Sequence, residues 1–182
     1  MEAYVYLRVR PGTTTTVRNH LASSSARRAV IVVGEWDLLC LLDGPDLASI
    51  GSTVLNEIQA IEGVERTLTA PVVPSDRLGV VGFAGPPIPP MVQGASYVHI
   101  AAEPGAAAGI YERLAEVGGI AGAAVLGGPW DVLVCIAEPW EVAAGVILEK
   151  IQALPGVRAT STLVSVDPEE PEEDRDQFSA WS

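Results

Sequence analysis

The chain is poor in basic residues. Of its 182 residues, 11 are Lys or Arg and 23 are Asp or Glu, which gives a formal net charge of −12 and a pI of about 4.4. Proteins that bind nucleic acids draw affinity from basic side chains that neutralise phosphates. The basic clusters here are short, Arg8 with Arg10 and Arg27 with Arg28. We therefore expect no direct binding to nucleic acid.

Cysteine and histidine are also scarce. Cys40 and Cys135 are too few for a disulfide framework, and both lie in apolar runs, which indicates small buried side chains. The two histidines, His20 and His99, have no Cys, His or Asp nearby at a metal-ligand spacing. Phosphate-binding, dinucleotide-binding and Gly-x-Ser-x-Gly motifs are missing. We expect no metal, no cofactor and no catalytic centre.

Long hydrophobic runs are missing as well. Met1 leads directly into a strand-like alternation, without the basic lead and apolar core of a signal peptide. The apolar stretches are far shorter than a membrane span requires. These absences favour a cytoplasmic protein that does not contact membranes.

What the chain does have is internal repetition. Three segments of the first half return in the second half, each 93 or 94 residues later. The pairs are 3–12 with 96–105, 34–39 with 128–133, and 58–64 with 151–157. Two copies at so long a period indicate tandem domains rather than a solenoid. We predict one domain at 1–73 and a second at 96–166.

Each copy predicts the order strand, helix, strand, strand, helix, strand. In the first copy, period-two alternation marks residues 3–10, and β-branched or apolar runs mark the strands near 29–33, 38–42 and 64–73. Thr13 and Asp46 are expected to cap the two helices. This order is that of the ferredoxin-like fold, an α+β unit in which two helices cover one face of a four-stranded sheet.

The pattern of apolar faces predicts how the copies pack. The second and third strands are apolar on both faces, yet helices cover only one of them. The other face, which carries Tyr4 and Tyr6, needs a second cover. We expect the two βαββαβ units to pack their sheets face to face, as in dimeric α+β barrels, within one chain or between chains. In the repeat alignment, His99 occupies the position of Tyr6, and Cys40 and Cys135 fall on opposite faces of their sheets.

Two segments lie outside the copies. Residues 74–95 are rich in Pro and Gly but hold an apolar run at 78–83, which favours a linker packed on the surface as an added edge strand and a polyproline segment. Residues 167–182 begin with seven acids and one arginine, which is typical of a disordered tail. Phe178 and Trp181 near its end are candidates for docking into a partner protein.

The candidate site is a Gly-x-Trp-Asp sequence that occurs in both predicted hairpins. Its glycine allows a positive φ at the turn, its carboxylate can accept backbone N–H groups across the turn or bind a ligand ammonium, and its tryptophan can form an apolar wall. The spacing fits a ligand site, and it fits a well-made hairpin somewhat better. The residues are Gly34, Trp36, Asp37, Gly128, Trp130 and Asp131.

The first hairpin, together with Tyr4-Val-Tyr6, Pro11-Gly12 and the Gly63 to Thr67 ending, resembles the effector-binding domain of leucine-responsive/AsnC (Lrp/AsnC) regulators. The resemblance covers 3–73 strongly and 96–166 less. It implies that a small effector, usually an amino acid, binds at subunit interfaces with help from the hairpins, and so it implicates the same six residues.

The sequence also departs from that family. The first strand begins at residue 3, so we expect a stand-alone form without a helix-turn-helix. Pro129 stands where the first copy has Glu35, and Arg66 has no basic counterpart. One copy is therefore a candidate for having lost ligand binding while keeping its pairing surface.

These observations favour a non-enzymatic sensing or regulatory protein that forms homo-oligomers, binds a small molecule and acts through a protein partner. Two alternatives remain open. The chain can be a structural scaffold whose acidic tail docks a partner. It can also be an enzyme of the dimeric α+β barrel type, because this fold does not fix a function.

Overall fold

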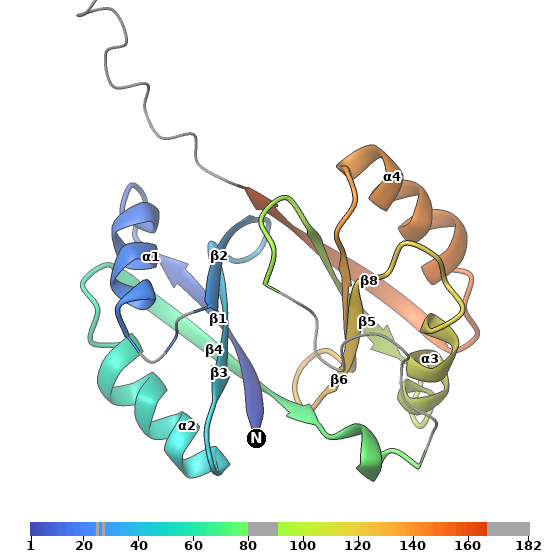
Figure 1. The fold of residues 1–182 in the computed structure, drawn as a ribbon, viewed down its shortest axis with the longest axis horizontal. Helices are drawn as coiled ribbons and strands as arrows, with labels where there is room; N and C mark the ends of the chain where they lie inside the picture. Colours follow the sequence, from blue (N-terminus) through green and yellow to red (C-terminus); the bar gives the residue numbers. More distant parts are fainter. Residues whose placement is uncertain (25, 27, 80–90, 167–182) are drawn as a thin grey trace, which may run out of the picture.

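A computed structural model describes residues 1–24, 26, 28–79 and 91–166 (Figure 1). The first half holds β1 (Glu2–Val9), α1 (Thr14–Ala22), β2 (Arg28–Val33), β3 (Leu38–Asp43), α2 (Leu47–Thr53), the π-helix η1 (Val54–Ile58) and β4 (Val64–Val73), and the short 3-10 helix η2 (Ser75–Arg77) follows. The second half holds β5 (Ser96–Ala102), α3 (Ala107–Leu114), β6 (Gly122–Leu126), β7 (Val132–Ile136), α4 (Trp140–Gly145), the π-helix η3 (Val146–Ile151) and β8 (Val157–Val166).

The strands form one closed antiparallel barrel in the order β1-β3-β2-β8-β5-β7-β6-β4. Each half supplies four neighbouring strands, and the halves join at two seams, where β2 pairs with β8 and β4 pairs with β6. The helices of each half cover the outer face of their own sheet, so the inner faces meet (Figure 1). The predicted α+β fold of two tandem ferredoxin-like units with facing sheets is confirmed, and the units pair within one chain.

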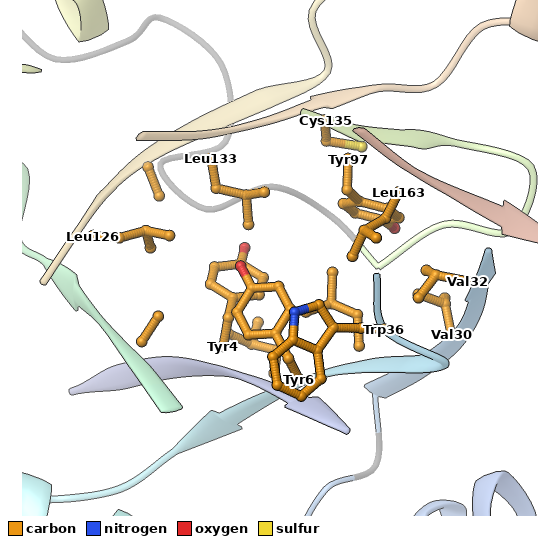
Figure 2. Close-up of a cluster of buried hydrophobic side chains, with 14 of the residues drawn as sticks. Tyr4, Tyr6, Val30, Val32, Trp36, Tyr97, Leu126, Leu133, Cys135 and Leu163 are labelled. Atoms are coloured by element: carbon orange, nitrogen blue, oxygen red, sulfur yellow. The ribbon is translucent and has the colours of Figure 1, made fainter. Parts of the chain in front are cut away.

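A cluster of apolar side chains from both halves fills the space between the sheets (Figure 2). Tyr4 and Tyr6, whose face was expected to need a cover, are 0% and 1% exposed. The first half contributes Tyr4, Tyr6, Val30, Val32, Trp36, Leu39, Leu41, Ala70 and Val72, and the second half contributes Ala95, Tyr97, Ala124, Leu126, Leu133, Cys135 and Leu163. The favourable free energy of burying this apolar surface is the main contribution that holds the two sheets together.

Each half has one further apolar cluster, which lies between its sheet and its helices. Cys40 belongs to the first of these, whereas Cys135 lies between the sheets, so the two thiols point to opposite sides as predicted. Burial raises the pKa of both thiols to about 12. The last strands cross the junction, because Val73 packs against the helix-side cluster of the second half and Val166 against that of the first. β4 and β8 therefore belong to the cores of both halves.

One of the two predicted helix caps is present. The Asp46 carboxylate accepts the backbone N–H of Ser49 at 2.7 Å, which is an N-cap bond. The prediction for Thr13 is wrong, since its side chain makes no capping bond. The turn at Pro11-Gly12 brings its hydroxyl back toward the Arg10 carbonyl oxygen, to which Thr13 Oγ1 donates at 2.7 Å.

The linker packs at both of its described ends. Leu78 contacts the helix-side cluster of the second half, and Met91 contacts the cluster between the sheets. Residues 80–90 lie outside the described residues, and with them most of the predicted edge strand and polyproline segment. In the part of the chain that is described, no helix is long and apolar enough to cross a bilayer.

Candidate functional site

The two hairpins lie at the junction of the halves, each against the last strand of the other half. Gly127 N donates to the carbonyl oxygen of Pro71 on β4 at 2.8 Å. A Cβ added at Gly128 would lie 3.3 Å from the Cβ of Ala70. A Cβ added at Gly34 would lie 2.7 Å from Cδ2 of Leu163 on β8. Both hairpins therefore form part of the contact between the halves.

The glycines of the two hairpins differ in conformation. Gly34 has a φ of 145°, as the turn argument predicted. For Gly128 the prediction is wrong, because it is not among the glycines with positive φ. The second connection spans residues 127–131, one residue more than 34–37. The extra residue changes the turn and removes the need for left-handed backbone at Gly128.

The hairpin aspartates brace neighbouring strands. Asp37 Oδ2 accepts the N–H of Val9 on β1 at 2.8 Å, and Asp131 Oδ2 accepts the N–H of Ala102 on β5 at 2.8 Å. Each of these N–H groups faces the hairpin, because the carbonyl oxygen two residues earlier on the same strand, that of Leu7 or Ile100, accepts the backbone N–H of the aspartate. Both lie just beyond the last register pair with β3 or β7. The acceptors thus serve strands β1 and β5 rather than their own turns, in the same way in both halves.

Four rings form a row from one hairpin to the other through the barrel interior. The Trp36 ring centroid lies 5.9 Å from that of Tyr6, Tyr6 lies 5.2 Å from His99, and His99 lies 5.6 Å from Trp130. Figure 2 shows Trp36 beside Tyr6 in the space between the sheets. Trp36 is 5% exposed, whereas Trp130 is partly exposed. Trp36 is therefore a core side chain more than a wall open to a ligand.

The centre of this row is a buried hydrogen bond between Tyr6 and His99. His99 Nε2 lies 2.8 Å from the Tyr6 hydroxyl, and His99 Nδ1 lies 3.3 Å from the carbonyl oxygen of Ser161. A carbonyl only accepts, so its partner assigns the proton to Nδ1 and makes Nε2 the acceptor from Tyr6. Burial lowers the pKa of His99 to about 4, against the opposing effect of the Ser161 carbonyl. Burial also raises the pKa of Tyr6, so both groups are neutral at pH 7.

A groove of about 340 Å³ lies at the β4–β6 seam. Its apolar lining includes Val72 from the first half and Tyr111 and Val125 from the second, and the acidic residues Glu2 and Asp76 also line it. The groove lies where β4 ends at Val73 and the chain leaves the sheet at Pro74.

The seam beside the groove continues along β4 to the second hairpin, since Val72 pairs with Leu126 and the neighbouring Pro71 accepts the N–H of Gly127. Sequence reasoning missed this groove. The proline that ends the strand was the available signal, but strand pairing between the halves was needed to place the second wall.

Phe178 and Trp181 lie outside the described residues, so their docking role stays a prediction. His20 is exposed on α1, with Nδ1 at 2.9 Å from the carbonyl oxygen of Thr16. Within the described ranges, His, Cys, Asp and Glu form no group of three or more suited to a metal ion.

Comparison with known proteins places the fold. The chain matches no family model and no curated protein. The siroheme decarboxylase NirDL matches over 92% of this chain and 71% of its own, with a TM-score of 0.67 and 10% identity. That likeness covers both halves and extends to the fold alone.

Single-half matches cover 37% of the chain. TTHA0845 from Thermus thermophilus matches at 29% identity over 86% of its own chain, with a TM-score of 0.36. The transcriptional regulator NMB0573 from Neisseria meningitidis, solved as an L-Met complex, matches at 20% identity over 46% of its chain, with a TM-score of 0.31.

Proposed function

We propose that this chain is a small-molecule-responsive regulatory protein, a tandem and stand-alone relative of the Lrp/AsnC effector-binding domain. The sequence resemblance of residues 3–73 supports the family. The observation that carries the function is the groove at the β4–β6 seam, whose walls come from both halves. A ligand in this groove contacts the two halves at once.

The seam is a suitable place for a ligand to act. β4 and β6 share two register pairs, Val72–Leu126 and Val73–Val125, whereas β2 and β8 share three. A volume of about 340 Å³ lies at the lower end of the range of small-molecule pockets, which suits a ligand of amino-acid size. We propose that the seam is closed when β4 and β6 are paired and open when they separate. A ligand that binds only the paired strands shifts the population toward the closed form by its differential affinity.

We propose that the protein senses rather than catalyses. Its titratable groups at the junction have structural partners, because Asp37 and Asp131 accept strand N–H groups and His99 is held between Tyr6 and Ser161. A general acid or base needs a proton position open to a substrate. The three side chains use their polar atoms in hydrogen bonds within the fold, which favours a structural role over an acid or base role.

The proposed output is a change in assembly or in contact with a protein partner. Leu55 and Leu148 occupy equivalent positions on the outer helices and are 63% and 64% exposed. Apolar side chains that project from both halves in the same way favour association with other subunits. We propose a homo-oligomer whose stability depends on the state of the seam.

A thermal-shift screen of the full chain with each of the twenty amino acids at millimolar concentration tests the proposal, because any ligand that binds the native state raises the melting temperature. Ser75 lines the groove, so Ser75→Phe is expected to fill it and abolish the response. Ala60→Phe, a similar enlargement at an exposed position, is the control. No shift with any amino acid, or an unchanged shift in Ser75→Phe, would contradict the proposal.

A further inference from the structure

Two arginines lie side by side at the end of β1 and β4 that is farthest from the groove. Arg8 and Arg66 are directly opposite residues in the antiparallel pairing, so their side chains leave the sheet on the same face. That face is the one that carries Tyr6 and Leu68, two residues away on each strand, toward the opposite sheet. Both arginines are exposed.

Trp36 fixes the position of one of them. The guanidinium carbon of Arg66 lies 5.4 Å from the centroid of the Trp36 ring, which is a cation–π contact. Trp36 is itself 5% exposed and is the first ring of the row that continues to Tyr6. The exposed Arg66 guanidinium is thus positioned against a buried ring.

Neither guanidinium is neutralised by a carboxylate of the described residues. The arginine ion pairs in that part of the chain join Arg10 to Glu62 and Arg77 to Asp76. Like charges directly opposite on neighbouring strands destabilise a sheet. In a chain with a net charge of −12, this pair therefore has a cost that no described acidic side chain offsets by direct contact.

The fold does not demand the pair either. The equivalent register pair in the second half is Ala101 with Ala159, in strands of the same pairing and with the same bulge. Small uncharged residues therefore satisfy this position. A pair of unneutralised arginines at one of two equivalent sites is the arrangement expected where a ligand supplies the missing negative charge.

We infer that Arg8 and Arg66 bind a small oxyanion that carries two negative charges, a phosphate or a dicarboxylate. The guanidinium fork matches both groups with two parallel N–H donors, and two forks side by side can hold both charges. Trp36 keeps Arg66 pre-organised, which reduces the entropy lost on binding. This site is separate from the groove and does not depend on the function proposed for it.

Isothermal titration calorimetry on the full chain tests the inference, with inorganic phosphate and succinate as probes at fixed ionic strength in a chloride buffer. We expect one of the two to bind at a single site. Arg8→Gln and Arg66→Lys are expected to weaken that binding at least tenfold, whereas Arg77→Gln, which removes a distant exposed arginine, leaves it within twofold. Binding of phosphate alone assigns the ligand to phosphate compounds, and binding of succinate alone to dicarboxylates.

Folding of the variants is checked by melting in the absence of both anions. Arg8→Gln is expected to melt at or above the wild-type temperature, because it removes a like-charge contact. The inference is overturned if neither probe binds the wild type, if both variants bind as the wild type does, or if Arg77→Gln weakens binding equally. Ser75→Phe is expected to leave this titration unchanged, so loss of the groove response and loss of oxyanion binding are distinguishable.

Discussion

Tyr6 donates its hydroxyl proton to Nε2 of His99 across 2.8 Å. The two residues are 93 positions apart and occupy the same place in their halves, so the bond joins the sheets where equivalent positions meet. It is a polar contact at the centre of a largely apolar interior, and the hairpin tryptophans flank it on both sides. Four experiments follow from this arrangement and from the hairpins.

Replacing Tyr6 by Phe removes the donor and leaves His99 Nε2 buried without a partner. An unsatisfied buried acceptor costs about 1–3 kcal/mol, and we expect the free energy of unfolding to fall by that amount. Urea denaturation at pH 7 measures it. A double-mutant cycle with His99→Gln separates the bond from the packing of the ring. A loss below about 0.5 kcal/mol in Tyr6→Phe would show that the bond contributes little.

Acid should destabilise the fold through His99. Its pKa is about 4 in the folded state because it is buried, and an unfolded histidine titrates near 6.5. Between these values the unfolded chain binds more protons, so stability is full above pH 6.5 and falls as the pH drops toward 4. The loss due to this group is about 3 kcal/mol. It is measured as the difference in urea stability between the wild type and His99→Gln across this range, which cancels the carboxylates. Parallel pH profiles would refute it.

The hairpin aspartates are predicted to be structural. Asp37→Ala leaves the N–H of Val9 without its acceptor, and Asp131→Ala does the same to the N–H of Ala102. Each substitution is expected to cost about 1–3 kcal/mol of folding stability. Asp37→Asn keeps an acceptor oxygen and is expected to cost less. Chemical denaturation of the three variants decides the order. Normal stability together with a lost amino-acid response would instead assign these carboxylates to ligand binding.

The two hairpin glycines form a matched pair. Gly34→Ala forces a Cβ onto a residue with φ of 145° and to within 2.7 Å of Leu163 Cδ2. Left-handed strain and the close contact together are expected to cost about 2–4 kcal/mol. Gly128→Ala meets Ala70 at 3.3 Å without a positive φ, so a cost below about 1 kcal/mol is expected. Thermal melts of the two variants test the order, and equal costs would exclude backbone conformation as its cause.

Much of the fold could be predicted because the repeat and the apolar faces are local patterns. The alternation at Tyr4 and Tyr6 marked the face that needed a cover, and the structure covers it with the second half. The cap at Asp46 followed from its position before an apolar stripe. The predicted cap at Thr13 was wrong, because the turn before this residue directs its hydroxyl to the Arg10 carbonyl oxygen.

The site was harder to predict because its contacts join the two halves. Alignment of the copies placed His99 at the position of Tyr6, but only the packing of the two sheets brings these residues together. The N–H groups that Asp37 and Asp131 accept, those of Val9 and Ala102, depend on the strand register. The alternation also placed Arg8 on the face of Tyr6, yet its neighbour Arg66 becomes visible only once β1 and β4 are paired.

The division of the interior between two copies affects how the chain must be made. β8, the last strand to leave the ribosome among those described, pairs with β2 near the start of the chain, so the barrel closes only late in synthesis. Until then the first copy shows its tyrosine-bearing face to solvent or to a chaperone. Strands that are far apart in the sequence pair slowly, and apolar faces that stay exposed until then promote aggregation. A truncated chain that ends after residue 73 should therefore be recovered as aggregates or as a pair of first copies.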